Sequence, residues 1–98
     1  MVEHIVLLRL SVSSDDAAIR RLSTALLTLQ DRIPGIVRIA FGANGSQEGL
    51  GRGYDLGFVV TFADGAARDA YLPHPEHQAV VLLVEAIADE VLVFDLSV

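Results

Sequence analysis

Apolar and polar positions along the first third of the chain follow the periods of a strand and then of a helix. Ile, Val and Leu dominate His4–Val12, which predicts a strand with apolar residues on both faces. Ser13–Asp16 then supplies the hydroxyl and carboxylate side chains typical of a helix start. Apolar residues next recur three and four positions apart, as on one face of a helix, at Ile19, Leu22, Leu26, Leu29 and Ile33. Pro34-Gly35 ends that helix.

The remaining pattern predicts two further strands, two helical pieces and a last strand. Ile36–Phe41 is expected to be a strand, and the glycine-rich Gly42–Gly53 a loop. Tyr54–Phe62 alternates as a third strand, with Tyr54, Leu56, Phe58, Val60 and Phe62 on one face. Asp64 caps a short helix that ends near Leu72, because Pro73 and Pro75 interrupt it. A second piece starts at Pro75 with a stripe of His77, Val80, Val81 and Val84, and Glu90–Val98 closes the chain as a strand.

The order strand, helix, strand, strand, helix, strand predicts a ferredoxin-like βαββαβ sandwich of the α+β class. The whole chain, residues 1–98, is expected to be one domain with helices on one face of a four-stranded antiparallel sheet. The open face of such a sheet should be polar, yet Leu92, Phe94 and Leu96 oppose Val91 and Val93. We therefore expect a homodimer that buries the open sheet face. A standard interface buries about 800 Å² per partner, an area that the face of a four-stranded sheet can supply.

Composition and charge narrow the classes of partner. The chain is 52% hydrophobic with a mean hydropathy of +0.48, an excess that a small domain hides most readily in an oligomer. Its net charge is −6 and all seven cations are arginines, which disfavours nucleic-acid binding. There is no cysteine, so disulfides and thiol chemistry are excluded. No segment resembles a signal peptide or a membrane span, and we expect a cytoplasmic protein that binds no membrane.

Acid–base side chains concentrate in Tyr71-Leu72-Pro73-His74-Pro75-Glu76-His77, which contains two of the three histidines and one of the two tyrosines. Imidazole is well suited to proton exchange near neutral pH. A structural role is the alternative for each residue. His77 can be a buried imidazole bonded to Asp95 or to a backbone carbonyl, and the remaining histidine, His4, can be satisfied by backbone groups. Tyr71 can belong to the core, and His74 can cap the helix that opens at Pro75.

With this motif and element order, the chain resembles the stress-responsive A/B barrel (Dabb) family, whose members form dimeric α+β barrels. The similarity runs nearly end to end. It includes His4-Ile5-Val6-Leu7, Ile33-Pro34-Gly35, Gly53-Tyr54-Asp55, the Tyr71–His77 segment and Val93-Phe94-Asp95. The Tyr-x-x-His-Pro-x-His element is the most specific part, and the other matches are ordinary strand and turn sequence in the right order.

The resemblance implies candidate site residues. In a polyketide cyclase of this family, which closes a linear chain by aldol condensation, the catalytic tyrosine and histidine match Tyr71 and His77. Pocket residues of that enzyme match His4, His74 and Asp95. Aromatic residues on its first helix are replaced here by Leu22, Ser23 and Leu26. The resemblance therefore implies the fold more strongly than it implies a substrate.

The predicted topology also brings these residues together. The last strand should run antiparallel beside the first, which places Asp95 near His4, and His77 should point inward from its helix stripe. Burial and the positive end of the helix dipole favour neutral imidazole, with Asp95 as the expected carboxylate partner of His77. Tyr71 could stabilise an oxyanion. The expected apolar pocket lining is His74, Val6, Leu8, Phe58, Val60, Leu26, Val91 and Val93.

Three functions are consistent with this arrangement. The leading hypothesis is cofactor-free proton transfer (aldol cyclisation, enolisation or isomerisation) on a small carbonyl compound, with His77, Tyr71, His4 and Asp95 as catalytic residues. The alternatives are a non-catalytic stress-response or ligand-binding dimer, with a small apolar or phenolic ligand, and a cofactor-free oxygenase. His74 and His77 lie three residues apart, but two imidazoles without a thiol are a poor metal-binding set, so we expect no metal site. Gly49–Gly53 lacks the lysine of a phosphate-binding loop, so we expect no nucleotide.

Overall fold

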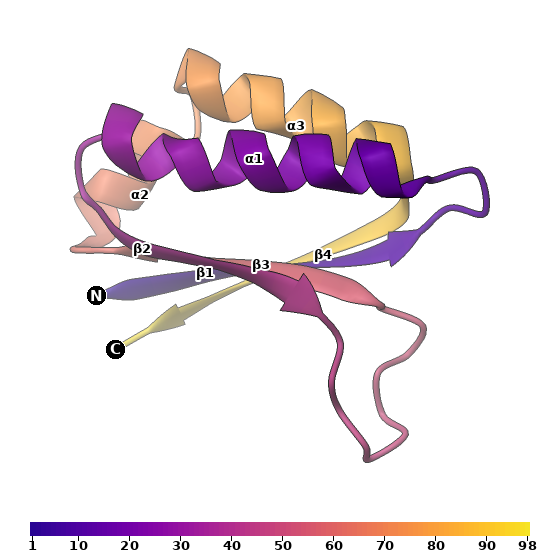
Figure 1. Ribbon diagram of the computed structural model, residues 1–98. Helices are drawn as coiled ribbons and strands as arrows, with labels where there is room; N and C mark the ends of the chain where they lie inside the picture. Colours follow the sequence, from indigo (N-terminus) through magenta and orange to yellow (C-terminus); the bar gives the residue numbers. More distant parts are fainter.

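The computed structural model describes residues 1–98 and consists of a four-stranded antiparallel sheet with three helices on one face (Figure 1). In chain order the elements are β1 (Val2–Leu10), α1 (Asp16–Arg32), β2 (Ile36–Ala43), β3 (Leu56–Phe62), α2 (Gly65–Tyr71), α3 (Pro75–Ile87) and β4 (Ala88–Ser97). The strands lie in the order β2-β3-β1-β4. This is the ferredoxin-like βαββαβ arrangement, so the predicted fold class is confirmed. No helix combines the length and apolar character needed to cross a bilayer.

Each helix begins where the sequence supplies a cap. The Asp15 carboxylate accepts a hydrogen bond from the Ala18 N–H at 2.8 Å, and Asp64 accepts one from Ala67 at 2.8 Å. At α3 the Nδ1 atom of His74 accepts from the Glu76 N–H at 3.1 Å, with Pro75 in the first turn. These contacts satisfy N–H groups that have no partner within the helix. The predicted helix starts are therefore confirmed.

The strand ends differ from the prediction by a few residues. β1 begins at Val2 instead of His4 and ends at Leu10, because Val2 pairs with both Phe62 and Ser97. β2 extends to Ala43, past the predicted boundary at Phe41, because Gly42 and Ala43 still pair with β3. β3 begins at Leu56 and not at Tyr54, and β4 covers Ala88–Ser97 instead of Glu90–Val98. Pairing with the neighbouring strand decides where each strand ends, and composition does not report it.

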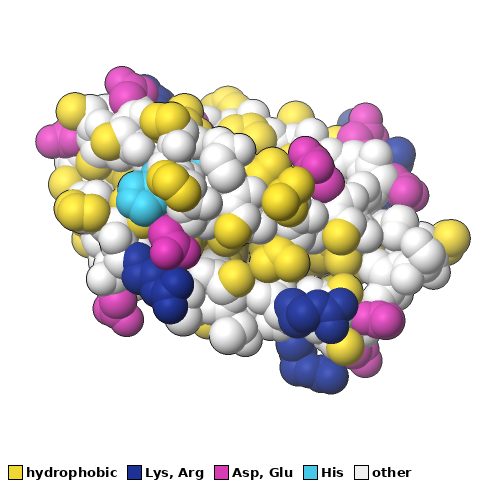
Figure 2. Space-filling view, turned by 90° about the horizontal axis from the view of Figure 1, so that it is seen from above, with side chains coloured by type: hydrophobic (Ala, Val, Ile, Leu, Met, Phe, Trp, Pro, Cys, Tyr) yellow, Lys and Arg dark blue, Asp and Glu magenta, His cyan; other side chains and the backbone are white.

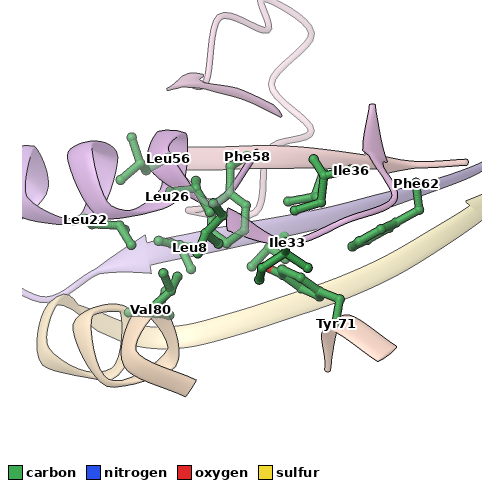
Figure 3. Close-up of a cluster of buried hydrophobic side chains, with 14 of the residues drawn as sticks. Leu8, Leu22, Leu26, Ile33, Ile36, Leu56, Phe58, Phe62, Tyr71 and Val80 are labelled. Carbon is green, nitrogen blue, oxygen red and sulfur yellow. The ribbon is translucent and has the colours of Figure 1, made fainter. Parts of the chain in front are cut away.

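The core lies between the helices and one face of the sheet (Figure 3). α1 contributes Leu22, Leu26 and Leu29, and α3 contributes Val80, Val84 and Ile87. The sheet contributes alternate residues such as Leu8 and Val60, which have no exposed surface. From above the helices, hydrophobic side chains are interspersed with charged ones, without a single large patch (Figure 2).

The opposite face of the sheet, which we call the outer face, carries apolar side chains that nothing in the chain covers. On β4, Leu92, Phe94 and Leu96 are 46%, 59% and 45% exposed. They share this face with Ile5 and Leu7 of β1, because directly paired residues point to the same side. The predicted second apolar face is therefore present.

Candidate functional site

Tyr71, the last residue of α2, is at the centre of a cluster of rings. Its side chain points from α2 into the core (Figure 3) and has no exposed surface. Its ring centroid lies 4.2 Å from that of His77, 4.9 Å from Phe62 and 6.0 Å from His4. The structure thus brings together the tyrosine and two of the three histidines that the sequence singled out.

The Tyr71 hydroxyl is buried and has no hydrogen-bond partner. It is the one buried side-chain polar atom of the chain in this state. Burying an unpaired hydroxyl costs about 1–3 kcal/mol, so such groups are rare in folded proteins. Burial also raises the pKa of Tyr71, which keeps the phenol protonated. The site therefore holds a hydrogen-bond donor with no acceptor in the chain.

His77 lies in the first turn of α3, half-buried against Tyr71. Its Nδ1 atom is 2.8 Å from the Leu72 carbonyl oxygen. A carbonyl only accepts, so Nδ1 carries the proton of the neutral ring and Nε2 is left with its lone pair. Burial, together with the neighbouring His4 and His74, lowers the pKa of His77 despite this hydrogen bond. His77 is therefore a neutral base at neutral pH.

Asp95 does not pair with His77, which corrects the predicted partner. Its Oδ1 atom lies 2.6 Å from Nδ1 of His4, and its Oδ2 accepts from the Arg68 guanidinium at 2.9 Å. The strand register explains the pairing, because His4 and Asp95 are directly opposite each other on β1 and β4. Burial alone would raise the pKa of Asp95, but the hydrogen bonds from His4 and Arg68 outweigh it and lower that pKa. The predicted proximity of Asp95 and His4 is confirmed.

Two partners in this cluster were not named from the sequence, the Leu72 carbonyl and Arg68. The Leu72 carbonyl follows the end of α2, where the last carbonyls lack helical partners, and it accepts from His77 and from Gln78 Nε2 at 2.9 Å. The prolines that interrupt the helix were the signal for it. Arg68 lies three residues before Tyr71 on α2, a spacing that puts both on neighbouring parts of the helix surface.

His74 is outside the ring cluster. Its ring nitrogen caps α3, as the structural alternative for this residue anticipated. No group of three or more His, Asp or Glu side chains gathers anywhere in the chain in a way that could hold a metal ion.

Apart from His74, the residues expected to line a pocket divide into two sets. Five of them are packed in the core with at most 5% exposure: Val6, Leu8, Leu26, Phe58 and Val60. The other two, Val91 and Val93, are 43% and 54% exposed on the helix side of β4. They share that face with Asp95, two residues beyond Val93, so an apolar surface leads to the His4–Asp95 pair.

Two hollows lie away from the ring cluster. One, of 640 Å³, is on the outer face beneath the β2–β3 loop and is walled by residues that include Ala40, Gly42, Phe58 and Leu92. The other, of 740 Å³, runs between α1 and α3 past Arg20, Arg32 and Glu76. Neither contains Tyr71 or His77.

The family model described as the stress responsive A/B barrel domain (Dabb) matches residues 2–98. The chain belongs to the Dabb family. A search of the curated proteins finds no match.

Several solved structures resemble this Dabb domain along its whole length. A dimeric ferredoxin-like protein of unknown function from Jannaschia sp. CCS1 is 33% identical, with a TM-score of 0.82 over 99% of this chain and 98% of that one. An Arabidopsis thaliana protein is 26% identical, with a TM-score of 0.91 over 100% and 95%. A hydroxynitrile lyase from Passiflora edulis has a TM-score of 0.89 over 99% and 92%, but at 17% identity it shows only the shared fold.

Proposed function

We propose that this Dabb domain is a homodimeric enzyme that catalyses proton transfer on a small carbonyl compound, with His77 as base and Tyr71 as oxyanion donor. One observation carries the proposal: a buried phenol without an acceptor lies against a neutral imidazole whose Nδ1–H is already used. A substrate carbonyl oxygen would supply the missing acceptor, and Nε2 of His77 is free to take a proton.

The chemistry needs no redox change. Nε2 of His77 removes a proton from the carbon next to the carbonyl, and the C–H electron pair forms an enolate whose oxygen accepts the Tyr71 hydrogen bond. In an isomerisation, His77 returns the proton to a different carbon. In an aldol closure, the enolate carbon bonds to a second carbonyl carbon, and the proton goes to the new alkoxide. The raised pKa of Tyr71 suits hydrogen-bond donation, since the phenol stays protonated throughout.

His4 supplies a second imidazole beside the Tyr71 ring, and its hydrogen-bond partner is a carboxylate where that of His77 is a carbonyl. Asp95 fixes the His4 ring through Nδ1, and Arg68 occupies the other oxygen of that carboxylate. This arrangement leaves Nε2 of His4 as the atom available to a ligand. The exposed Val91 and Val93 beside it suit an apolar substituent of the substrate. Substrate entry is from the half-buried His77, the most exposed of the rings around Tyr71.

The comparisons support both parts of the proposal. Structurally similar ferredoxin-like proteins from Jannaschia and Thermobifida fusca are described as dimeric, and the uncovered outer face is the surface that a second copy would bury. A hydroxynitrile lyase shares the fold, so the scaffold supports lyase chemistry in another protein.

A non-catalytic dimer, in which these side chains serve packing or hold a ligand without turnover, is the second candidate, and the enclosure of Tyr71 favours the packing role. Neither the outer-face hollow nor the hollow between α1 and α3 reaches this side chain, and Phe62, His4 and His77 surround it. A binding role requires the same free hydroxyl but no proton exchange, so an exchange assay separates the two functions.

The test is deuterium exchange followed by NMR. Wild-type protein is incubated in D₂O with a panel of small β-diketones, β-keto esters and aryl ketones, and loss of the signal of the hydrogens next to the carbonyl is timed. We expect exchange above the buffer rate for at least one compound, reduced about 10²–10³-fold in Tyr71→Phe, as for loss of one oxyanion donor. His77→Asn, which keeps a donor for Leu72, should abolish it. Binding without exchange would favour the non-catalytic dimer.

A further inference from the structure

The 740 Å³ hollow is a groove between α1 and α3, which lie side by side over the sheet (Figure 1). Its α1 wall consists of two ridges, in each of which residues follow one another at spacings of four. One ridge is Arg20, Thr24, Thr28 and Arg32, and the other is Ala17, Arg21, Ala25 and Leu29. The groove therefore has arginines toward both ends and short side chains between them.

The floor of the groove is apolar and closed toward the core. Leu29 of α1 and Val80 of α3 line it and are only 1% and 3% exposed. Above them the walls are low, because Ala25 of α1 and Ala79 of α3 carry no more than a methyl group. A depression of this kind between two packed helices has the shape that accepts a third helix.

The groove is basic, although the chain as a whole is acidic. Three arginines and one glutamate line it, in a chain with 13 acidic residues and seven arginines. Arg32 pairs with Glu76 at 3.3 Å, but Arg20 and Arg21 take part in none of the ion pairs of the chain. The groove thus has a surplus of positive charge, which attracts acidic groups.

The spacing of the arginines indicates an extended ligand. Arg20 and Arg32 are 12 residues apart on α1, which is about 18 Å along the helix axis. One carboxylate or one phosphate group cannot contact both ends at once. The ligand that fits carries acidic groups at two separate places and apolar groups between them.

We propose that the groove docks an acidic amphipathic helix of another protein. Its apolar face lies on Ala25, Ala79 and Val80, and its carboxylates pair with Arg20 and Arg21 at one end and with Arg32 at the other. A lipid bilayer is too flat to reach the floor of a groove, and a nucleic acid would extend over the acidic surroundings. The site contains neither Tyr71 nor His77, so it is independent of the proposed function.

A designed peptide tests the site by fluorescence anisotropy. The probe is a fluorescein-labelled peptide of about 16 residues, with leucine and alanine on one helical face and glutamates near both ends. A second peptide has the same residues in an order that destroys the apolar face. We expect the first peptide to bind and to gain helical circular dichroism, and the second to bind at least about tenfold more weakly.

Two pairs of variants separate the charges from the shape of the groove. Arg20→Gln/Arg21→Gln should weaken binding about fivefold or more at low salt, whereas Arg38→Gln/Arg52→Gln, which removes the same charge outside the groove, should not. Ala79→Leu fills the groove without changing charge and should weaken binding about tenfold or more. Ala86→Leu, also exposed on α3 but outside the groove, is its matched control.

The other outcomes would overturn the proposal. They are no binding of the first peptide up to about 1 mM, equal binding of the two peptides, or binding that Ala79→Leu leaves unchanged. Vesicles of phosphatidylcholine with about a quarter phosphatidylserine provide a further arm, and tighter binding to them than to the peptide would identify a membrane surface instead. A larger oligomer of the wild type that Ala79→Leu dissociates, seen by analytical ultracentrifugation, would identify a second copy as the occupant.

Discussion

The two imidazoles beside Tyr71 differ in their hydrogen-bond partners, and this difference sets their chemistry. His77 donates to a neutral carbonyl, whereas His4 is bonded to a carboxylate that also binds Arg68. Burial lowers the pKa of His77, whereas the Asp95 carboxylate fixes the His4 ring through Nδ1. The free Nε2 of His77 is therefore the atom to which we assign the role of base.

The lowered pKa of His77 predicts how stability depends on pH. The unfolded histidine, with its ordinary pKa of about 6.5, binds a proton at a higher pH than the folded one, so folding loses stability as pH falls through that value. We expect the free energy of unfolding to fall more steeply from about pH 7.5 to about pH 5, a range that spans this pKa, in wild type than in His77→Asn. Denaturant titrations at each pH measure it, and equal slopes would contradict a depressed pKa.

Arg68 is expected to act on Asp95 and hardly at all on global stability. Both partners of this ion pair are partly exposed, at 27% and 25% of their side chains, so solvent screens the pair and Arg68→Gln should leave the free energy of unfolding nearly unchanged. The same change removes one of the two hydrogen bonds that lower the pKa of Asp95, so that pKa should rise. NMR titration of the Asp95 carboxyl carbon checks this, with Arg68→Lys as partial rescue. An unchanged titration would show that His4 alone sets the Asp95 pKa.

At the scale of residues, the sequence predicted which side chains lie together better than it predicted their hydrogen-bond partners. The Tyr71–His77 contact and the His4–Asp95 pair were predictable, because the motif spacing and the antiparallel pairing of the first and last strands determine them. The expected partner of His77, Asp95, was wrong, because a free helix-end carbonyl beside the ring competes with a distant carboxylate. The prolines mark the break in the helix but do not say which side chain its free carbonyl accepts from. Arg68 depends on how a two-turn helix sits over the sheet, which no local pattern reports.

At the scale of elements, the break between α2 and α3 shapes the site. Pro73 and Pro75 stop one helix and start the next, and the resulting turn exposes the Leu72 carbonyl to His77. His74 begins α3 by accepting from the Glu76 N–H. Tyr71 and His77 are therefore held by two separate helices whose junction is fixed by prolines.

The cap predicts a stability effect at His74 that is independent of catalysis. His74→Ala should lower the free energy of unfolding by about 0.5–1 kcal/mol, the usual cost of losing a cap, whereas His74→Asn should restore most of it. Urea denaturation measures both effects. The exchange rate of the best substrate should stay within about twofold of wild type, because losing this cap removes no side chain that contacts Tyr71. A large loss of activity with intact stability would place His74 in the chemistry instead.

Caps and prolines made the helix starts predictable, whereas strand ends were not. A strand ends where its pairing with the neighbouring strand ends. Gly42 and Ala43, which were predicted to be loop, therefore belong to β2 because they pair with β3. This error had a consequence for the outer face. With Gly42 assigned to a loop, the small-residue edge of the sheet and the hollow above it were not foreseeable.

At the scale of the whole molecule, the two faces of the sheet differ. The helix side encloses the ring cluster of Tyr71, His77 and His4, and the outer face leaves apolar side chains exposed. The net charge of −6 makes two copies repel each other, so burial of the apolar side chains of the outer face must outweigh that repulsion in a dimer. The ring cluster and the proposed dimer surface lie on opposite faces of one sheet, so replacing an exposed side chain of the outer face removes no contact of Tyr71.

The central claim is that the Tyr71 hydroxyl is kept free of structural hydrogen bonds for a ligand. Its most direct test is the free energy of unfolding of Tyr71→Phe, measured by urea denaturation at a fixed protein concentration, because association shifts apparent stability. We predict a value equal to that of wild type or about 1 kcal/mol higher, since the change removes a buried hydroxyl with no partner. A loss of about 1 kcal/mol or more would show that the hydroxyl stabilises the fold, and would contradict the account.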